Sequence, residues 1–254
     1  MAGGRVTSRT GTAPDRYVYY PGSEEIGGDE IRIVAGGTGM PTARRSQTAT
    51  SFVVELGNGD KFIFDIGSGS MQNIQSLMIP SDFLSKVFLT HLHTDHWGDL
   101  GSLWAGGWTA GRTSPLKVWG PSGAREDMGT AYAVEHMLKA YNWDYMTRAV
   151  TINPVPGEIE VTEFDYRAVN EVVYQENGVT IRSFPAIHSL ADGCVRPAGP
   201  APACVRLQQN PGVCQLSGRP LPGRNQRTQR PTLLVGQRHH ISLLHLRPPC
   251  LGIR

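Results

Sequence analysis

The sequence predicts an α/β domain, and two observations carry this prediction. Short apolar or alternating runs, bounded by glycine, proline and asparagine, alternate with longer segments of helical periodicity over residues 30–184, a pattern typical of strands and helices in one domain. A cluster of histidine and aspartate residues directly follows one of the predicted strands, and loops at strand ends commonly carry function. The 254 residues are enough for one large domain, and no run of 18 apolar residues predicts a membrane span.

The elements can be placed in order along the chain. Strands are expected at residues 30–35, 51–56, 61–66, 87–89, 116–119, 158–164 and 179–184. Helices are expected at residues 74–84 (broken near Pro80), 97–108 and 123–141. The stretches around Asn58-Gly59 and Asn177-Gly178 are typical of hairpin turns.

The last quarter of the chain differs sharply in composition from the rest. All 22 acidic residues lie at or before Asp192, so residues 1–192 hold 15 basic and 22 acidic residues, whereas residues 193–254 hold nine arginines and no acid. The same segment has all four cysteines and nine of the 18 prolines, and it has no aromatic residue. Three interpretations stay open: a basic disordered arm that binds anionic partners, a disulfide-bearing extension, and out-of-frame translation. The abruptness of the change favours the third.

The expected organisation therefore has three parts. Residues 1–16 are rich in Gly, Thr, Ser and Arg and read as a disordered leader without the apolar core of a signal peptide. Residues 17–192 form the domain, and residues 193–254 form a tail that is disordered or out of frame. As written, the chain is expected in the cytoplasm.

The most informative stretch is His91-Leu92-His93-Thr94-Asp95-His96, directly after the predicted strand 87–89. On an extended backbone, His91 and His93 point to the same side, whereas on a helix they would diverge, which excludes a zinc helix of the HExxH type. Neutral imidazole and carboxylate are the ligands of hydrolytic zinc sites. The alternative is a histidine-rich surface loop without metal.

This HxHxDH pattern resembles that of the metallo-β-lactamase superfamily. Further stretches resemble its zinc-dependent arylsulfatase branch, over roughly residues 17–190. These stretches are Gly37–Pro41, Phe62–Gly67, Leu103–Trp108 and Pro185–His188. The resemblance implies an αββα sandwich, in which two αβ halves pack sheet on sheet with helices outside. The chain would contain the N-terminal half and only the start of the second.

The resemblance also implies a ligand set for two zinc ions. One ion would be held by His91, His93 and His188, and the second by Asp95, which would also serve catalysis, and His96. A water between the ions would attack the substrate. A bridging Asp and a last His would come from the C-terminal half, but no Asp follows Asp192, so one zinc ion or none is expected here.

Asp65 is expected to support this site. It ends the strand 61–66, and in the family an Asp here orients the metal-binding loops, as a ligating histidine needs a hydrogen-bond acceptor. The alternative is an ordinary turn aspartate.

The resulting prediction is a zinc-dependent hydrolase of sulfate esters that acts on a small-molecule ester, with neither nucleic acid nor membrane as a partner. A homo-oligomer is left open, and some relatives are exported to the periplasm. The first alternative is a phosphodiesterase such as a tRNA 3′-processing nuclease, although Thr94 replaces the glycine usual there and no RNA-gripping arm is visible. The second alternative is an inactive, truncated zinc-binding fragment.

Other features admit two interpretations each. The loop Gly36–Gly39 is either a phosphate cradle or, as we favour, a tight turn near the metal site. Trp97, Trp104 and Trp108 share one helical face and either wall an aromatic pocket or, as we favour, pack in the core. His136 has no ligand partner nearby in sequence and is expected to be structural.

Overall fold

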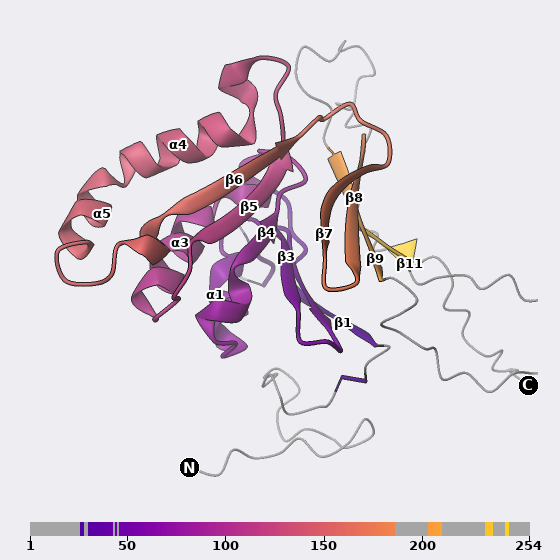
Figure 1. The fold of residues 1–254 in the computed structure, drawn as a ribbon, viewed down its shortest axis with the longest axis horizontal. Helices are drawn as coiled ribbons and strands as arrows, with labels where there is room; N and C mark the ends of the chain where they lie inside the picture. Colours follow the sequence, from indigo (N-terminus) through magenta and orange to yellow (C-terminus); the bar gives the residue numbers. More distant parts are fainter. Residues whose placement is uncertain are drawn as a thin grey trace, which may run out of the picture.

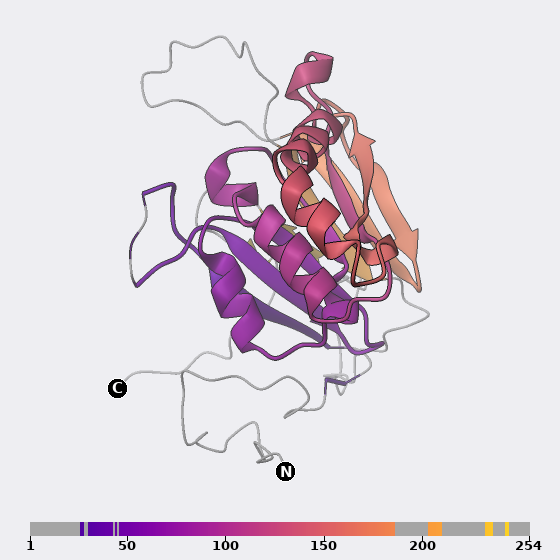
Figure 2. The same cartoon turned by 90° about the vertical axis from the view of Figure 1, so that its left-hand side faces the viewer.

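Two β-sheets pack face to face, and helices cover the outer face of the first sheet (Figure 1). The computed structural model describes residues 26–27, 30–42, 44 and 46–185, together with the backbone of three short strands further on, at 203–209, 232–235 and 242–243. The α/β prediction and the sandwich of the family are confirmed for this part of the chain. Figure 2 looks onto the helical layer.

The first sheet has six strands in the order of the sequence. They are β1 (Ile31–Gly37), β2 (Ser51–Leu56), β3 (Lys61–Ile66), β4 (Lys86–Phe88), β5 (Leu116–Pro121) and β6 (Ile159–Phe164). The first three pair antiparallel, and β3 to β6 pair parallel. Parallel neighbours need crossover connections, which here contain the helices.

The helices of these crossovers are short. They are α1 (Ser70–Ser76), α2 (Thr94–Trp97), α3 (Leu100–Thr109), α4 (Thr130–Ala140) and α5 (Asn142–Arg148), with 3-10 turns η1 (Ser81–Leu84), η2 (Glu126–Met128) and η3 (Val155–Gly157). The second sheet has the order β11-β10-β9-β8-β7 and is antiparallel. Its strands are β7 (Glu171–Glu176), β8 (Val179–Pro185), β9 (Ala203–Gln209), β10 (Thr232–Val235) and β11 (Ser242–Leu243).

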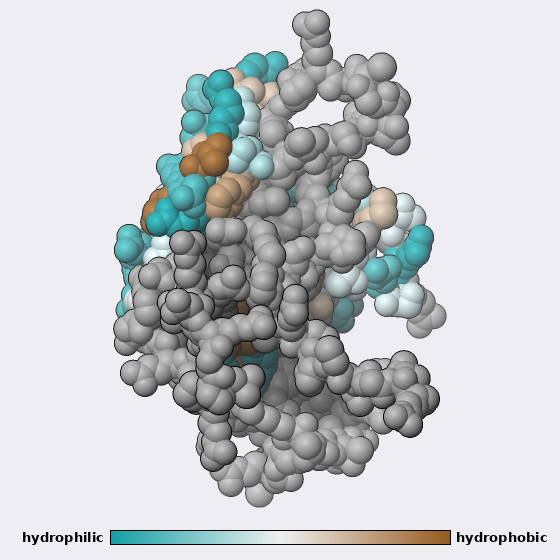
Figure 3. Space-filling view, turned by 90° about the vertical axis from the view of Figure 1, so that its right-hand side faces the viewer, coloured by the Kyte–Doolittle hydropathy of each residue, from teal (hydrophilic) through white to brown (hydrophobic). Residues whose placement is uncertain are grey.

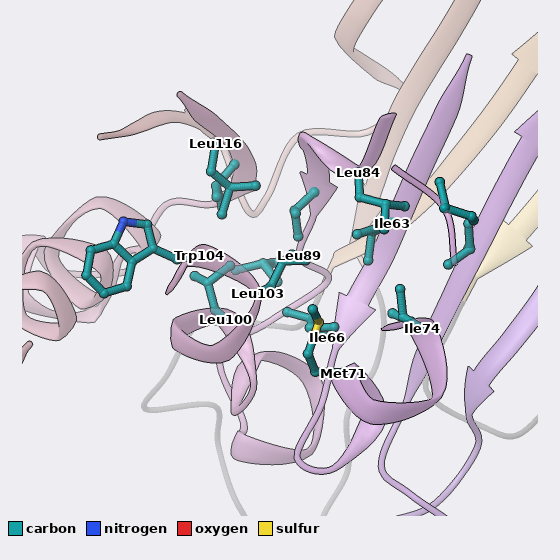
Figure 4. Packing of buried hydrophobic residues seen from close by; sticks show 14 of the residues in the cluster. Ile63, Ile66, Met71, Ile74, Leu84, Leu89, Leu100, Leu103, Trp104 and Leu116 are labelled. Atoms are coloured by element: carbon teal, nitrogen blue, oxygen red, sulfur yellow. The ribbon is translucent and has the colours of Figure 1, made fainter. Parts of the chain in front are cut away.

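The central strands of the first sheet are buried on both faces, so they read as nearly continuous apolar runs. Along β3, Ile63 faces the helices and belongs to the larger core cluster, which also contains Leu103 and Trp104 of α3 (Figure 4). Its neighbours Phe62 and Phe64 face the second sheet, in a cluster with Tyr174 and Ile181 and other residues. Each sheet face therefore has its own core.

A polar network joins the two sheets at one end. Lys86 donates hydrogen bonds to Asp60 Oδ1 at 2.9 Å and to the Tyr174 hydroxyl at 3.0 Å. Burial lowers the pKa of Lys86, but these two hydrogen bonds and the charges of the partners raise it more, so the pKa lies above its ordinary value. Burial is also the main reason that the pKa of Tyr174 is raised.

Several predicted boundaries were wrong. The helix expected over 74–84 is α1 followed by the turn η1, and the helix expected over 97–108 is divided at Gly98 and Asp99 into α2 and α3. The helix expected over 123–141 begins only at Thr130. Helix α5 and strand β7 had not been predicted.

The tryptophan stripe belongs to the core. Trp104 and Trp108 are buried, and their indole N–H groups donate to the carbonyl oxygens of Gly157 and Asn153, at 2.7 Å each. An aromatic substrate pocket at these two residues is therefore excluded. His136 stacks on Tyr132, and its Nδ1 lies 2.8 Å from the Tyr132 carbonyl oxygen, which is consistent with a structural role.

The described surface on the side of β7 and β8 is mostly hydrophilic, with few hydrophobic residues among the hydrophilic ones (Figure 3). Within the residues that the structure describes, no helix is long and apolar enough to cross a membrane. The interpretations of residues 1–16 and 193–254 stay predictions.

Candidate metal centre

The histidine motif lies where parallel strands β3 and β4 end side by side, the edge at which α/β sheets place their functional loops. Thr90 follows β4 and His93 precedes α2, so His91 and His93 lie on extended chain, as predicted, whereas Asp95 and His96 lie in the first turn of α2. His91, Asp95 and His96 are buried, and His93 is exposed.

Asp65 connects the two strand ends. Its carboxylate accepts hydrogen bonds from the Thr90 backbone N–H at 2.8 Å and from the Thr90 hydroxyl at 2.9 Å, and it lies 2.7 Å from Nδ1 of His96. The side chain is 1 % exposed and the backbone has φ 59°, a left-handed conformation that aspartate tolerates better than most residues. An ordinary turn aspartate would be exposed, so this geometry matches the orienting role expected for Asp65.

These hydrogen bonds imply which nitrogen of each histidine carries the proton. A carboxylate only accepts, so Nδ1 of His96 must donate to Asp65. The Thr90 hydroxyl uses its one proton on Asp65, so it accepts the proton of His91 Nδ1, which lies 3.1 Å away. Nε2 of both rings is then left with its lone pair outward, the form in which a histidine binds metal.

The donor atoms form two pairs. Nε2 of His91 lies 3.0 Å from Nδ1 of His93, and Nε2 of His96 lies 3.5 Å from Oδ2 of Asp95. Two ligand atoms at about 2.1 Å from one tetrahedral zinc ion are roughly 3.4 Å apart, so each pair has the spacing of two ligands of one ion. The other carboxylate oxygen of Asp95 is buried without a hydrogen-bond partner among the described residues.

The residues present thus fit half of each of two zinc sites. Among the described residues, no three His, Cys, Asp or Glu side chains are grouped to hold one metal ion. The predicted third ligand of the first pair, His188, lies outside the described residues. The assignment of His91, His93, Asp95, His96 and His188 as ligands stays a prediction.

When no metal is bound, the charges around His96 favour the positively charged form of the ring, which carries a second proton. Burial lowers the pKa of His96, but the charge of Asp65, the hydrogen bond to Asp65 and the charge of Asp95 together raise it above the ordinary value. A divalent cation would be stabilised by the same two carboxylates.

Close backbone packing fixes the motif against its neighbours. A Cβ atom on Gly67 would overlap the carbonyl oxygen of Asp95, which accepts a hydrogen bond from the Thr50 N–H at 3.0 Å. A Cβ atom on Gly37 would likewise overlap the backbone of Ala49. Gly36 and Gly37 are the last residues of β1 and not part of a turn, so the expected tight turn is not found there, although the close approach of a neighbouring backbone is.

Sequence reasoning missed Thr90, although it directly precedes the motif. Its contribution depends on Asp65, 25 residues earlier, and only the pairing of β3 and β4 brings the two together.

The comparison with known proteins agrees with this arrangement. The sequence profile of the family described as "Metallo-beta-lactamase superfamily" matches residues 45–173, half of the 254 residues. The chain belongs to the metallo-beta-lactamase superfamily. The match includes the whole HxHxDH motif and Asp65.

Several of the curated relatives that this chain resembles are named ribonuclease Z. The chain is 33% identical to ribonuclease Z of Mycolicibacterium gilvum, over 63% of this chain and 53% of the relative, and 35% identical to that of Mycobacterium marinum, over 62% and 54%. The short form of human tRNase Z superposes with a TM-score of 0.48 at 14% identity, over 71% of this chain and 65% of that one. The chain spans about half the length of the curated relatives it matches.

Two predictions are corrected by these relatives. The statement that no nucleic acid is a partner is wrong, because these curated relatives are named as ribonucleases. The arylsulfatase branch is unsupported, since the relatives match the alternative, a tRNA 3′-processing nuclease, better.

Proposed function

We propose that this chain represents a zinc-dependent hydrolase that cleaves RNA phosphodiesters, of the tRNA 3′-processing type. The observation that carries the proposal is the 33–35% identity to ribonuclease Z over 164 residues. The geometry supports it because the four donor side chains of the motif are paired at metal-ligand spacing on one edge of the sheet.

The residues of this chain would hold and orient the metal. His91 and His93 would contribute to one zinc ion, and Asp95 and His96 to the other. When bound, zinc supplies a Lewis acid that activates water at neutral pH and stabilises charge on a phosphoryl oxygen. Asp65 would keep the His96 proton on Nδ1, and Thr90 would do the same for His91, so that Nε2 of each ring has the lone pair that binds metal.

Two features of the sequence bear on whether this chain can hydrolyse a substrate. Thr94 stands where tRNA 3′-processing nucleases usually have glycine, and it lies exposed at the start of α2, so its side chain leaves the buried donors undisturbed. No Asp follows Asp192 that could bridge the two ions, and the histidines that follow it, His239, His240 and His245, lie outside the described residues. The rival proposal is therefore a fragment that binds at most one zinc ion and hydrolyses nothing.

One set of measurements separates these readings. Zinc per chain is determined by mass spectrometry of metals, and hydrolysis is tested on an RNA hairpin with a 3′ extension and on an aryl sulfate. We expect zinc-dependent cleavage of the RNA, no desulfation, and loss of cleavage in His93→Ala. Desulfation without RNA cleavage would establish the sulfatase instead. Metal at one equivalent or less with both substrates intact would establish the inactive fragment.

A further inference from the structure

Asp65 is the extra residue of a β-bulge in strand β3. Ser51 of β2 pairs with Ile66, and the next residue of β2, Phe52, pairs with Phe64. Asp65 therefore stands between the two pairs without a partner of its own on β2. Bulges commonly redirect a side chain next to a functional site, and here the side chain of the bulged residue is the carboxylate that connects the two strand ends at the candidate metal centre.

This bulge makes two demands on its surroundings. Asp65 has a φ of 59°, a left-handed conformation that glycine adopts freely and other residues adopt at a cost. The bulge also takes Asp65 out of the regular ladder of hydrogen bonds. Since Asp65 is 1 % exposed, its carbonyl oxygen cannot rely on water and needs another donor from the protein.

Ser51 supplies that donor. Its hydroxyl donates a hydrogen bond to the carbonyl oxygen of Asp65 at 2.7 Å, and Ser51 is 0 % exposed. A hydroxyl carries one proton, so this bond uses the only donor of the side chain. A fully buried hydroxyl is costly unless it is hydrogen-bonded, so the contact satisfies both the serine and the bulge.

The strand on the other side of β2 shows the same arrangement. On β1, Gly36 is left between two residues that pair with β2. The carbonyl oxygen of Gly36 accepts hydrogen bonds from the Thr48 hydroxyl at 2.9 Å and from the Asn73 side-chain amide at 2.8 Å. Side-chain donors therefore serve the carbonyl oxygens of both bulged residues, and at Asp65 this donor is Ser51.

We propose that Ser51 is a positioning residue of the candidate metal centre. By holding the carbonyl oxygen of Asp65, it fixes the bulge that turns the Asp65 carboxylate toward Thr90 and His96. The hydrogen bond that Ser51 donates ends on a backbone oxygen, so its influence on a metal ion passes through Asp65. In its consequence for metal binding, this inference rests on the proposed zinc-dependent function.

The test compares Ser51→Ala with a control that loses the same kind of hydrogen bond elsewhere. The control is Thr130→Val, because the Thr130 hydroxyl is also buried and donates to a backbone carbonyl oxygen, that of Pro121, at 2.8 Å. Zinc affinity of the full chain is measured by competition with a chromophoric chelator. We expect Ser51→Ala to lower it about 10-fold, as for other groups that orient metal ligands, and Thr130→Val to leave it unchanged.

Two further measurements separate positioning from a general loss of stability. In Ser51→Ala/Asp65→Asn, the loss of zinc affinity should not exceed that of Asp65→Asn alone, because the effects of residues that act through one another do not add. In the metal-free chain, the Thr90 N–H donates to Asp65. Its hydrogen exchange should become at least about 10-fold faster in Ser51→Ala, through local opening, and should stay the same in Thr130→Val.

The outcomes that would overturn the proposal are specific. Wild-type zinc affinity in Ser51→Ala, additive losses in the double variant, or unchanged exchange of the Thr90 N–H would each do so. A wild-type chain that binds no zinc would instead overturn the proposed function. The exchange of the Thr90 N–H, which is measured without metal, would then still decide whether Ser51 holds Asp65 in place.

Discussion

The role of Asp65 yields the sharpest prediction, through the substitution Asp65→Asn. Asparagine keeps the size of the side chain and tolerates the φ of 59°, so the backbone stays in place. The carboxylate accepts hydrogen bonds on both oxygens: Oδ1 accepts from the Thr90 N–H, and Oδ2 accepts from the Thr90 hydroxyl and from His96 Nδ1. An amide accepts on one oxygen only and donates from its nitrogen.

The consequence for the site follows from this mismatch. If the amide oxygen stays with Thr90, the NH₂ group faces His96, whose proton must move to Nε2, the atom that lies 3.5 Å from Asp95. The loss of a hydrogen bond to a buried charged group lowers the free energy of unfolding by about 1–3 kcal/mol, or Tm by roughly 3–10 °C at this size. Zinc affinity is expected to fall about 10–100-fold, as for other groups that orient metal ligands.

Two measurements check these effects against a matched control. Competition with a chromophoric chelator gives the zinc affinity, and ¹⁵N NMR of the imidazoles reports the protonated nitrogen of His96 without metal. Asp82→Asn is the control, because both of its bonds from Thr113 end on one oxygen, which the amide retains. Wild-type zinc affinity in Asp65→Asn, or a His96 proton still on Nδ1, would refute the reasoning.

Three further predictions concern the motif, its packing and the response to pH. His93→Ala should abolish zinc binding while the free energy of unfolding of the metal-free chain changes by less than about 0.5 kcal/mol, since the side chain is exposed. A variant that loses zinc binding only because the metal-free chain is itself strongly destabilised would contradict this prediction. Gly67→Ala, whose Cβ overlaps the Asp95 carbonyl, should destabilise the chain by about 1–3 kcal/mol in urea unfolding, whereas Gly106→Ala inside α3 meets only a 3.6 Å contact and should be neutral or stabilising by up to ~1 kcal/mol. The raised pKa of Lys86 means that its contribution to stability is complete below the unfolded pKa of about 10.4 and is lost as the pH rises through the higher folded pKa; Lys86→Met should flatten the fall in Tm above pH ~10, and an unchanged slope would show that this lysine does not control it.

The strands of the first sheet were predictable because their burial depends on the local sequence pattern. The runs at 51–56 and 61–66 match β2 and β3 residue for residue, since strands buried on both faces need nearly continuous apolar residues. Strand β7 was missed because most of its residues are exposed, with Tyr174 the buried exception, so its sequence carries neither an apolar run nor a clear alternation.

The helices were harder to place for a related reason. The sequence around Gly98 and Asp99 continues a helical period, but Asp99 N–H donates to the carbonyl oxygen of Ile66 and the Asp99 side chain accepts the N–H of Met71. Both partners are distant in the sequence. The break between α2 and α3 is therefore set by tertiary hydrogen bonds, which a local pattern does not contain.

The prediction of the arylsulfatase branch failed because it was based on residues that several branches of the superfamily share. The motif of His91 and His93 and the strand that ends at Asp65 describe how a metal is held, and a metal-activated water can attack sulfate or phosphate esters alike. The choice of substrate depends on the walls around the metal. Of the three tryptophans that we had considered for such a wall, Trp104 and Trp108 are core residues, and Trp97 packs against the core while partly exposed.

The hydrogen bonds that orient the described half of the candidate metal centre are made by residues of that same half. Asp65, Thr90 and the two histidines that they orient lie on the segment from β3 to α2, and the hydrogen bonds that the structure describes among them involve no residue after His96. In the proposed site, the tautomers that zinc requires would thus be set by this part of the chain, and ligands of the C-terminal half would complete the coordination and need not create its geometry. This division explains how a chain that spans about half of its curated relatives keeps a recognisable HxHxDH arrangement, and the proposed hydrolysis would depend on ligands beyond those that this arrangement supplies.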